Sequence, residues 1–164
     1  MLGRWALRVR RVHARARPFR QSPAGLLQRA RAVEEDLSVR LGGGKDAPAR
    51  ARRALSRLRG DVDAPTLETL RLLVSEIVAN SVRHARSDGV SLRVLVQPGT
   101  VLTEVSDDGD GFEPDADRGP RPDHTGWGLF LVERLADRWG VVRDGDSTRV
   151  WFELRRATVG SRPA

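Results

Sequence analysis

An apolar stripe with a helical period runs through residues 68–85 and is the strongest structural pattern in the sequence. Apolar side chains recur every three or four positions between Leu67 and Val82, which predicts one long helix with a face turned toward a core. A carboxylate, Glu76, and an amide, Asn80, are four residues apart in this region, so they project from nearly the same side of the helix. Any fold for this chain must cover the stripe and must also explain two polar groups at the edge of a core.

Shorter patterns on both sides of this helix indicate strands and further helices. Residues 90–96 and 101–107 alternate between apolar and other side chains, and the "PGT" between them predicts a hairpin turn. The other predicted elements are a strand at 37–41, a helix from the possible N-cap Asp46 to about Leu58, a helix at 127–139, and two strands near 140–143 and 148–155. This order predicts an α+β fold, a two-layer α/β sandwich with helices on one face of a mixed, largely antiparallel sheet.

Composition narrows the class of protein. The 164-residue chain contains no cysteine, which excludes disulfides and cysteine-ligated metal sites. No apolar run approaches the roughly 18 residues of a membrane span. The N-terminus lacks the apolar segment of a secretory signal. We therefore expect one cytoplasmic domain that does not enter the membrane.

The net charge of +7 is unevenly distributed along the chain. Residues 1–33 contain nine arginines and no acidic residue, which leaves a net charge of −2 for residues 34–164. Charge runs of this kind are usually solvated, so we expect residues 1–33 to be a poorly ordered basic extension. The folded domain is expected at residues 34–157, followed by a tail at 158–164. The extension could also contact nucleic acid, an acidic partner or an anionic membrane.

The first motif that carries chemistry is "SDDGDGF", which contains Asp107, Gly109 and Gly111 at the end of a predicted strand. By alternation, Asp107 points to the covered face of the sheet, where a carboxylate needs a hydrogen-bond donor. An adenine amine is one candidate donor, and the two glycines suit a sharp turn or a close approach of the backbone to a ligand. A polar turn without a ligand is the alternative, and a calcium loop is disfavoured because the acidic residues lack the required spacing.

The second motif is "TGWGL", in which Gly126 and Gly128 stand where a loop enters a helix. Free backbone N–H groups and the positive end of the helix dipole favour an anion at such a position. An ordinary glycine-rich helix entry would show the same pattern.

The order of these motifs resembles the histidine-kinase-like ATPase superfamily, whose architecture is the Bergerat fold. Glu-x-x-x-Asn on a long helix is followed by a hairpin ending in Asp-x-Gly-x-Gly, a glycine-rich loop, and Gly-x-Gly-Leu at the start of a helix. The segments "VSEIVANSVRHA", "VSDDGDGF" and "GWGLFLVERLADRWGV" look most like the anti-sigma factor serine/threonine kinases of bacteria. This resemblance covers residues from about 37 to 155.

The resemblance implies specific roles for the residues that match the motifs. The glutamate matching Glu76 acts as general base in that family, and the amide matching Asn80 holds a Mg²⁺ that bridges the ATP phosphates. The resemblance further implies an adenine site and a phosphate site. The residues matched to these two sites are Asp107, Gly109, Gly111 and, as the nearest match, Thr148 for adenine, and Gly126, Gly128 and Leu129 for phosphates.

The function implied by the resemblance is an ATP- and Mg²⁺-dependent protein kinase that regulates transcription. Such a protein phosphorylates a serine or threonine of an anti-anti-sigma antagonist, sequesters a sigma factor, and is expected to be a homodimer. The alternative is an ATP-dependent partner-switch module without significant kinase turnover. A sensor histidine kinase is disfavoured, because His13 lacks the acidic neighbour usual for a phospho-accepting histidine.

Overall fold

The computed structural model describes residues 37–84, 89–107, 127–144 and 147–156. These ranges form five strands, three α-helices and one 3₁₀ helix. In chain order, the elements are β1 (Leu37–Gly42), α2 (Ala47–Leu55), η1 (Ser56–Gly60), α3 (Ala64–His84), β2 (Gly89–Gln97), β3 (Thr100–Asp107), α4 (Trp127–Leu135), β4 (Arg138–Asp144) and β5 (Ser147–Arg155). The predicted order of elements is confirmed.

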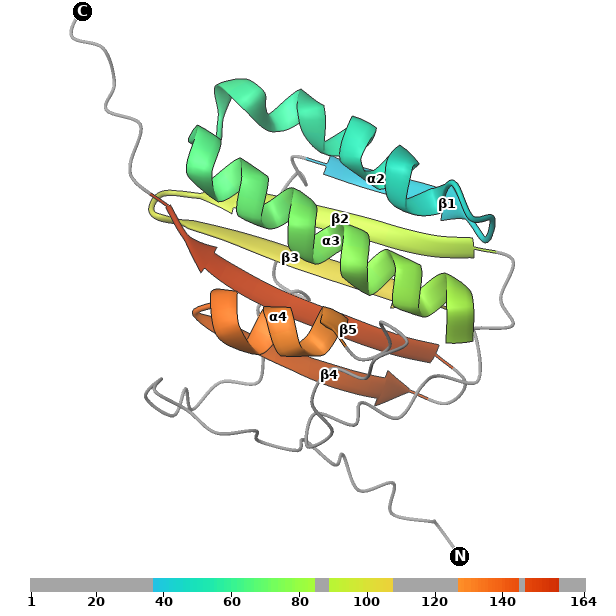
Figure 1. The fold of residues 1–164 in the computed structure, drawn as a ribbon. Coiled ribbons are helices and arrows are strands. Elements are labelled where there is room, and N and C mark those ends of the chain that lie inside the picture. The colour runs from blue at the N-terminus through green and yellow to red at the C-terminus, as the bar shows by residue number, and fades with distance from the viewer. Residues whose placement is uncertain (1–36, 85–88, 108–126, 145–146, 157–164) are drawn as a thin grey trace, which may run out of the picture.

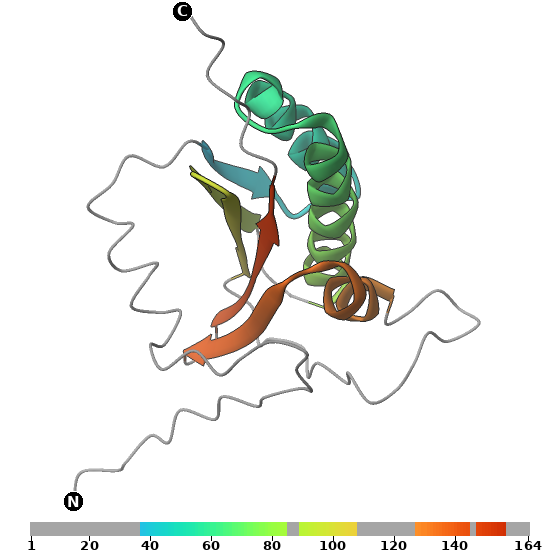
Figure 2. The same cartoon turned by 90° about the vertical axis from the view of Figure 1, so that its left-hand side faces the viewer.

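The five strands form one sheet in the order β1-β2-β3-β5-β4, and the three α-helices lie on the same face of it (Figures 1 and 2). The α+β class and the two-layer arrangement are therefore confirmed. The predicted mixture of strand directions is wrong in one respect, because all four pairings among the described strands are antiparallel. β2–β3 and β4–β5 are consecutive antiparallel pairs, and β1 and β2 are joined through α2 and α3. β3 and β4 run in the same direction, but β5 lies between them and pairs antiparallel with both, so no parallel pair arises.

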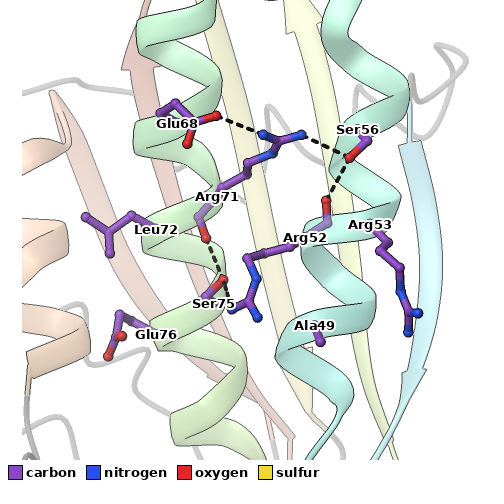
Figure 3. A pocket seen from close by; sticks show the side chains of 9 residues that line it. All are labelled: Ala49, Arg52, Arg53, Ser56, Glu68, Arg71, Leu72, Ser75 and Glu76. Carbon is purple, nitrogen blue, oxygen red and sulfur yellow. Dashed lines mark hydrogen bonds and ion pairs between the residues drawn. The ribbon is translucent and has the colours of Figure 1, made fainter.

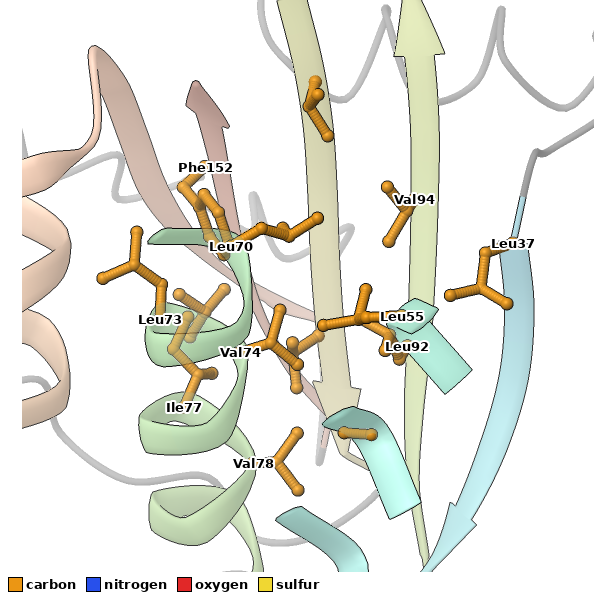
Figure 4. Close-up of a cluster of buried hydrophobic side chains, with 14 of the residues drawn as sticks. Leu37, Leu55, Leu70, Leu73, Val74, Ile77, Val78, Leu92, Val94 and Phe152 are labelled. Atoms are coloured by element: carbon orange, nitrogen blue, oxygen red, sulfur yellow. The ribbon is translucent and has the colours of Figure 1, made fainter. Parts of the chain in front are cut away.

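The core lies between α3 and the sheet (Figure 4). The predicted stripe on α3 is buried from Leu67 to Val78 and half-buried at Val82, and its side chains meet inward-facing residues of the central strands. Fully buried side chains of this core include Leu70, Leu73, Val74, Ile77 and Val78 on α3, with Leu92 and Val94 on β2 and Phe152 on β5. This packing explains why α3 keeps its 21-residue length, since helices in proteins are stabilised mainly by burial of their apolar face.

One local prediction needs correction. The helix predicted at 127–139 ends at Leu135, and Trp139 belongs to β4, where it pairs with Phe152 of β5. Asp46 stands at the N-cap of α2, as predicted, although its side chain makes no capping hydrogen bond. Its carboxylate instead accepts a hydrogen bond from Arg50 Nη2 at 2.8 Å, because a charged donor one turn away competes with the backbone.

The opposite face of the sheet carries a second, smaller apolar cluster, which none of the described helices covers (Figure 2). Its buried members are Leu95, Leu102 and Trp151, with Val142 packed against them. The Trp151 ring lies over Gly140, its partner on the neighbouring strand. A Cβ atom at Gly140 would stand only 2.7 Å from Trp151 Nε1, so the missing side chain of Gly140 leaves room for the ring.

Candidate functional site

Glu76 and Asn80 lie on α3 at the edge of the core, as the sequence predicts. The Asn80 residue is buried, whereas Glu76 is half-buried. Ile77 and Val78, which stand between them in the sequence, are fully buried and hold the helix against the sheet. The amide therefore sits in a fixed position, and the carboxylate keeps access to solvent one turn before it.

The first turn of α4 packs directly against Asn80. A Cβ atom built at Gly128 would lie 2.3 Å from Asn80 Nδ2 and 3.4 Å from the Glu76 carbonyl oxygen. No side chain fits at such distances, so Gly128 allows the start of α4 to approach α3 at this point. The contact brings the N-terminus of one helix beside a buried amide on another, an arrangement that suits an anion and its counter-ion.

Asp107 and Thr148 form a cross-strand pair at the adjoining end of the sheet. Asp107 is the last residue of β3 and Thr148 lies directly opposite it on β5. Both are almost completely buried, with 2% and 1% of their surfaces exposed. The predicted inward orientation of Asp107 is confirmed, and the register places Thr148 beside it. A carboxylate acceptor and a hydroxyl that can donate or accept thus stand side by side, which fits a heterocycle with mixed polar edges.

These residues gather at one end of the molecule. The last turns of α3, the start of α4, the end of β3 and the start of β5 all lie at this end of the sheet (Figure 1). Gly109, Gly111 and Gly126 lie outside the described residues. The side chain of Leu129 is 6% exposed and belongs to the core, so any contact with a nucleotide would have to come from its backbone.

A groove of about 660 Å³ opens beside Glu76, between α2 and α3 (Figure 3). Three arginines line it: Arg52 and Arg53 from α2 and Arg71 from α3. The α2–η1 segment, residues 47–60, contains five arginines and no acidic residue. The sequence analysis missed this groove, although the arginine run was the signal that could have identified it.

Hydrogen bonds hold two of these arginines in place across the groove. Arg71 Nη2 donates to Ser56 Oγ at 2.9 Å, and Arg71 Nη1 donates to Glu68 Oε1 at 2.8 Å. Arg52 Nη1 donates to Ser75 Oγ at 3.2 Å. Arg53 and Leu72 remain exposed at the rim, with Leu72 43% exposed. The groove therefore has a positively charged wall and an apolar rim that leads to Glu76, which is a surface suited to a protein segment.

None of the helices in the described parts of the chain has the length and apolar character needed to cross a bilayer.

Comparison with curated proteins identifies relatives among bacterial kinases. The serine-protein kinase RsbW of Bacillus subtilis is 37% identical over 111 residues, which cover 58% of this chain and 68% of RsbW. RsbW of Bacillus velezensis is 38% identical over 97 residues, covering 50% of this chain and 61% of that protein. The blue-light-activated histidine kinase 2 of Erythrobacter litoralis is 36% identical over 101 residues, or 57% of this chain and 29% of that kinase. The chain thus spans 61–68% of the length of the two RsbW proteins.

The fold also matches a solved structure, that of the RsbU and RsbW domains of a Mycobacterium tuberculosis protein. The TM-score is 0.58 with 24% sequence identity, and the match covers 78% of this chain and 33% of the other. At this identity the likeness shows the fold alone.

A family model supplies the last comparison. The model described as a histidine kinase-like ATPase domain matches residues 45–154, well over half of the chain. The matched range contains Glu76, Asn80, Asp107 and Thr148, which the structure brings to one end of the sheet. The chain therefore belongs to the histidine kinase-like ATPase family and is a distant relative of the RsbW serine-protein kinases.

Proposed function

We propose that this protein is an ATP-dependent serine/threonine kinase that phosphorylates an anti-anti-sigma antagonist and sequesters a sigma factor. The observation that carries the proposal is the contact of Gly128 with Asn80, one turn from Glu76 on the same helix. It joins a half-buried carboxylate, a buried amide and the N-terminus of a helix in one place. The family membership accounts for the ATP site, and the similarity to RsbW suggests the protein substrate.

The site residues suit this chemistry in different ways. Asn80 can offer an amide oxygen to Mg²⁺, which prefers hard oxygen ligands and often needs only one or two from the protein. The N-terminus of α4 can receive phosphate oxygens. Asp107 can accept a hydrogen bond from the adenine amine, with Thr148 beside it. ATP, when bound, supplies the phosphoryl group.

Glu76 is the group best placed to act on the substrate hydroxyl. It is half-buried, so it can reach a serine or threonine side chain presented from solvent. Its carboxylate would accept the hydroxyl proton as the oxygen is phosphorylated. The arginine-lined groove ends at Glu76, and we propose that an acidic segment of the antagonist lies there while its hydroxyl reaches the carboxylate.

The test separates nucleotide binding from phosphoryl transfer. Asn80→Ala should lower the affinity for ATP in the presence of Mg²⁺ and abolish transfer, because it removes the metal ligand. Glu76→Gln should keep Mg-ATP binding but reduce transfer by roughly 10²–10⁴-fold, because it removes the base. Calorimetry with and without Mg²⁺ measures the first effect, and labelled ATP with candidate antagonist proteins of the same genome measures the second.

Glu133→Gln is the matched control for the base. Glu133 is a half-buried glutamate like Glu76, but it lies on α4 and does not line the groove. Its substitution should leave transfer within a few-fold of the wild-type rate. Unchanged Mg-ATP affinity in Asn80→Ala would contradict the metal role. Full nucleotide binding without transfer to any antagonist in the wild-type protein would favour the partner-switch module.

A further inference from the structure

Arg52, in the groove between α2 and α3, has a guanidinium that is held in place by a neutral partner. Its Nη1 atom donates to Ser75 Oγ at 3.2 Å, and Ser75 Oγ in turn donates to the Arg71 carbonyl oxygen at 2.7 Å. Ser75 is buried, so this contact fixes one side of the guanidinium against α3 (Figure 3). The rest of Arg52 is exposed, and within the part of the chain that the structure describes no acidic side chain forms an ion pair with it.

Arg71, on the other side of the groove, is in a different electrostatic state. Its Nη1 atom donates to Glu68 Oε1 at 2.8 Å, and only 17% of its side chain is exposed. The charge of Arg71 is therefore already balanced by an acidic residue of the same helix. Arg52 has used one N–H group on a hydroxyl, and a guanidinium has five N–H donors in a planar fork. It can still bind a carboxylate through two parallel hydrogen bonds.

The segment that contains Arg52 offers no carboxylate of its own. Residues 47–60 include no aspartate and no glutamate, and the nearby Asp46 binds Arg50 at 2.8 Å. An acidic ligand would therefore meet an oriented positive charge at Arg52 without displacing an internal ion pair. Such complementarity favours an acidic side chain over a neutral or basic one.

Arg52 also lies at a definite spacing from Glu76, the proposed base. Ser75, which holds Arg52, directly precedes Glu76 on α3 (Figure 3). Consecutive helix residues are turned by about 100°, so at a helix radius of about 5–6 Å their side chains end about 8–9 Å apart. In a polyproline II conformation, residues three positions apart share one face and stand about 9 Å from each other. The spacing of the two groups therefore matches three residues of an extended substrate.

We propose that Arg52 determines substrate specificity by binding an aspartate or glutamate three positions from the phosphorylated serine or threonine. Ser75 is the positioning residue that orients the guanidinium for this contact. The inference rests on the proposed kinase function, because the acceptor hydroxyl must be presented to Glu76. It deepens that function by naming the feature of the substrate that the groove recognises.

A positional library of serine peptides tests the preference in the full-length protein. Each peptide carries one serine and one glutamate, which is placed in turn at every position on either side of the serine, and a reference peptide carries glutamine instead. Transfer from labelled ATP should be roughly 5-fold higher with glutamate than with glutamine three positions from the serine, the gain expected of a solvent-exposed ion pair.

Arg52→Glu should abolish this gain and favour lysine at the same position, while its affinity for Mg-ATP stays at the wild-type value. Arg59→Glu is the matched control and should keep the preference for glutamate, because Arg59 is an exposed arginine of η1 that does not line the groove. Ser75→Ala should reduce the gain without reversing it, because the guanidinium loses its orienting contact but keeps its charge.

A preference for glutamate that persists in Arg52→Glu, has its maximum at another position, or is absent from the wild-type protein would overturn the inference. The proposed kinase function would still stand, because peptides would be phosphorylated. Fluorescence anisotropy of the same peptides provides a second readout if none of them is phosphorylated. Tighter binding of the glutamate peptide that is lost in Arg52→Glu would then support recognition by Arg52 and count against kinase turnover. Equal binding of the glutamate and glutamine peptides would overturn the inference.

Discussion

Position 128 must be glycine, because the Asn80 amide occupies the space that any side chain at this position would need. Gly128→Ala should displace either the amide or the start of α4. We expect the affinity for ATP to fall on the order of 10- to 100-fold, as displacements of about 1 Å in binding groups do. Gly60→Ala is the control, because no atom lies within 4 Å of a Cβ built there. Equal ATP affinities in the two variants, measured by calorimetry, would contradict the proposed site.

Thr103 offers a second test of a single side chain. It is fully buried on the helix-covered face of β3, and its Oγ1 atom has no hydrogen-bond partner among the residues that the structure describes. Thr103→Val removes the unsatisfied hydroxyl and keeps the shape, so the free energy of unfolding should rise by about 1 kcal/mol. Thr148→Val, also in a buried position, should instead weaken ATP binding because Thr148 lies beside Asp107. Urea unfolding and nucleotide titration of both variants would check this contrast.

Alternation along a strand was enough to predict where Asp107 points, because each β residue reverses the side-chain direction. It did not identify the partner of Asp107, since the register between β3 and β5 depends on a hairpin whose turn follows residue 144. The proximity of Gly128 to Asn80 was equally hidden, because 47 residues separate them and only tertiary packing brings them together.

At the scale of elements, the start of α3 shows how a cap depends on its surroundings. The Thr66 backbone N–H donates to Asp63 Oδ1 at 3.1 Å, one residue before the helix begins. Burial alone would raise the pKa of Asp63. Hydrogen bonds from Thr66 and the positive charge of Arg156 outweigh it and hold this pKa below its usual value. The charged cap therefore stabilises the fold.

Asp63→Ala should lower the free energy of unfolding by about 1 kcal/mol at neutral pH. Since the folded-state pKa is lowered, the contribution of the charge is complete above the unfolded value near 3.8. It is lost as pH falls through the lower folded-state pKa. Asp46→Ala should have little effect at either pH, because Asp46 makes no capping hydrogen bond. Denaturant unfolding at pH 7 and below pH 3.8 measures the free energy of unfolding of both variants. An equal decrease in this free energy for Asp63→Ala and Asp46→Ala would rule out a stabilising cap at Asp63.

The end of α4 shows why element boundaries resist prediction. Apolar residues continue past Leu135 to Trp139 at a spacing that also suits a helix. Pairing with β5 decides the outcome: Asp137 N donates to Glu153 O at 3.0 Å, and Arg155 N donates to Asp137 Oδ2 at 2.7 Å. These bonds connect residues 16 to 18 positions apart, so local periodicity does not contain them.

At the scale of the whole molecule, the basic N-terminal segment offers a test by truncation. Deleting residues 1–33 removes nine arginines and no acidic residue. The thermal midpoint and the affinity for ATP should barely change, because charge runs of this kind are usually solvated. A collapse of folding in the truncated protein, measured by calorimetry, would show instead that these residues belong to the folded domain.

The strand order has a consequence for synthesis on the ribosome. β5 is the last strand made, yet it lies between β3 and β4 and supplies Thr148 to the adenine side of the proposed site. Until it emerges, β3 presents eight residues of unpaired backbone, an edge that invites association with other nascent chains. A chain stopped before residue 147 lacks both the strand that closes this edge and the threonine beside Asp107. Translation of the final hairpin is therefore the step that completes the described sheet and the proposed nucleotide site together.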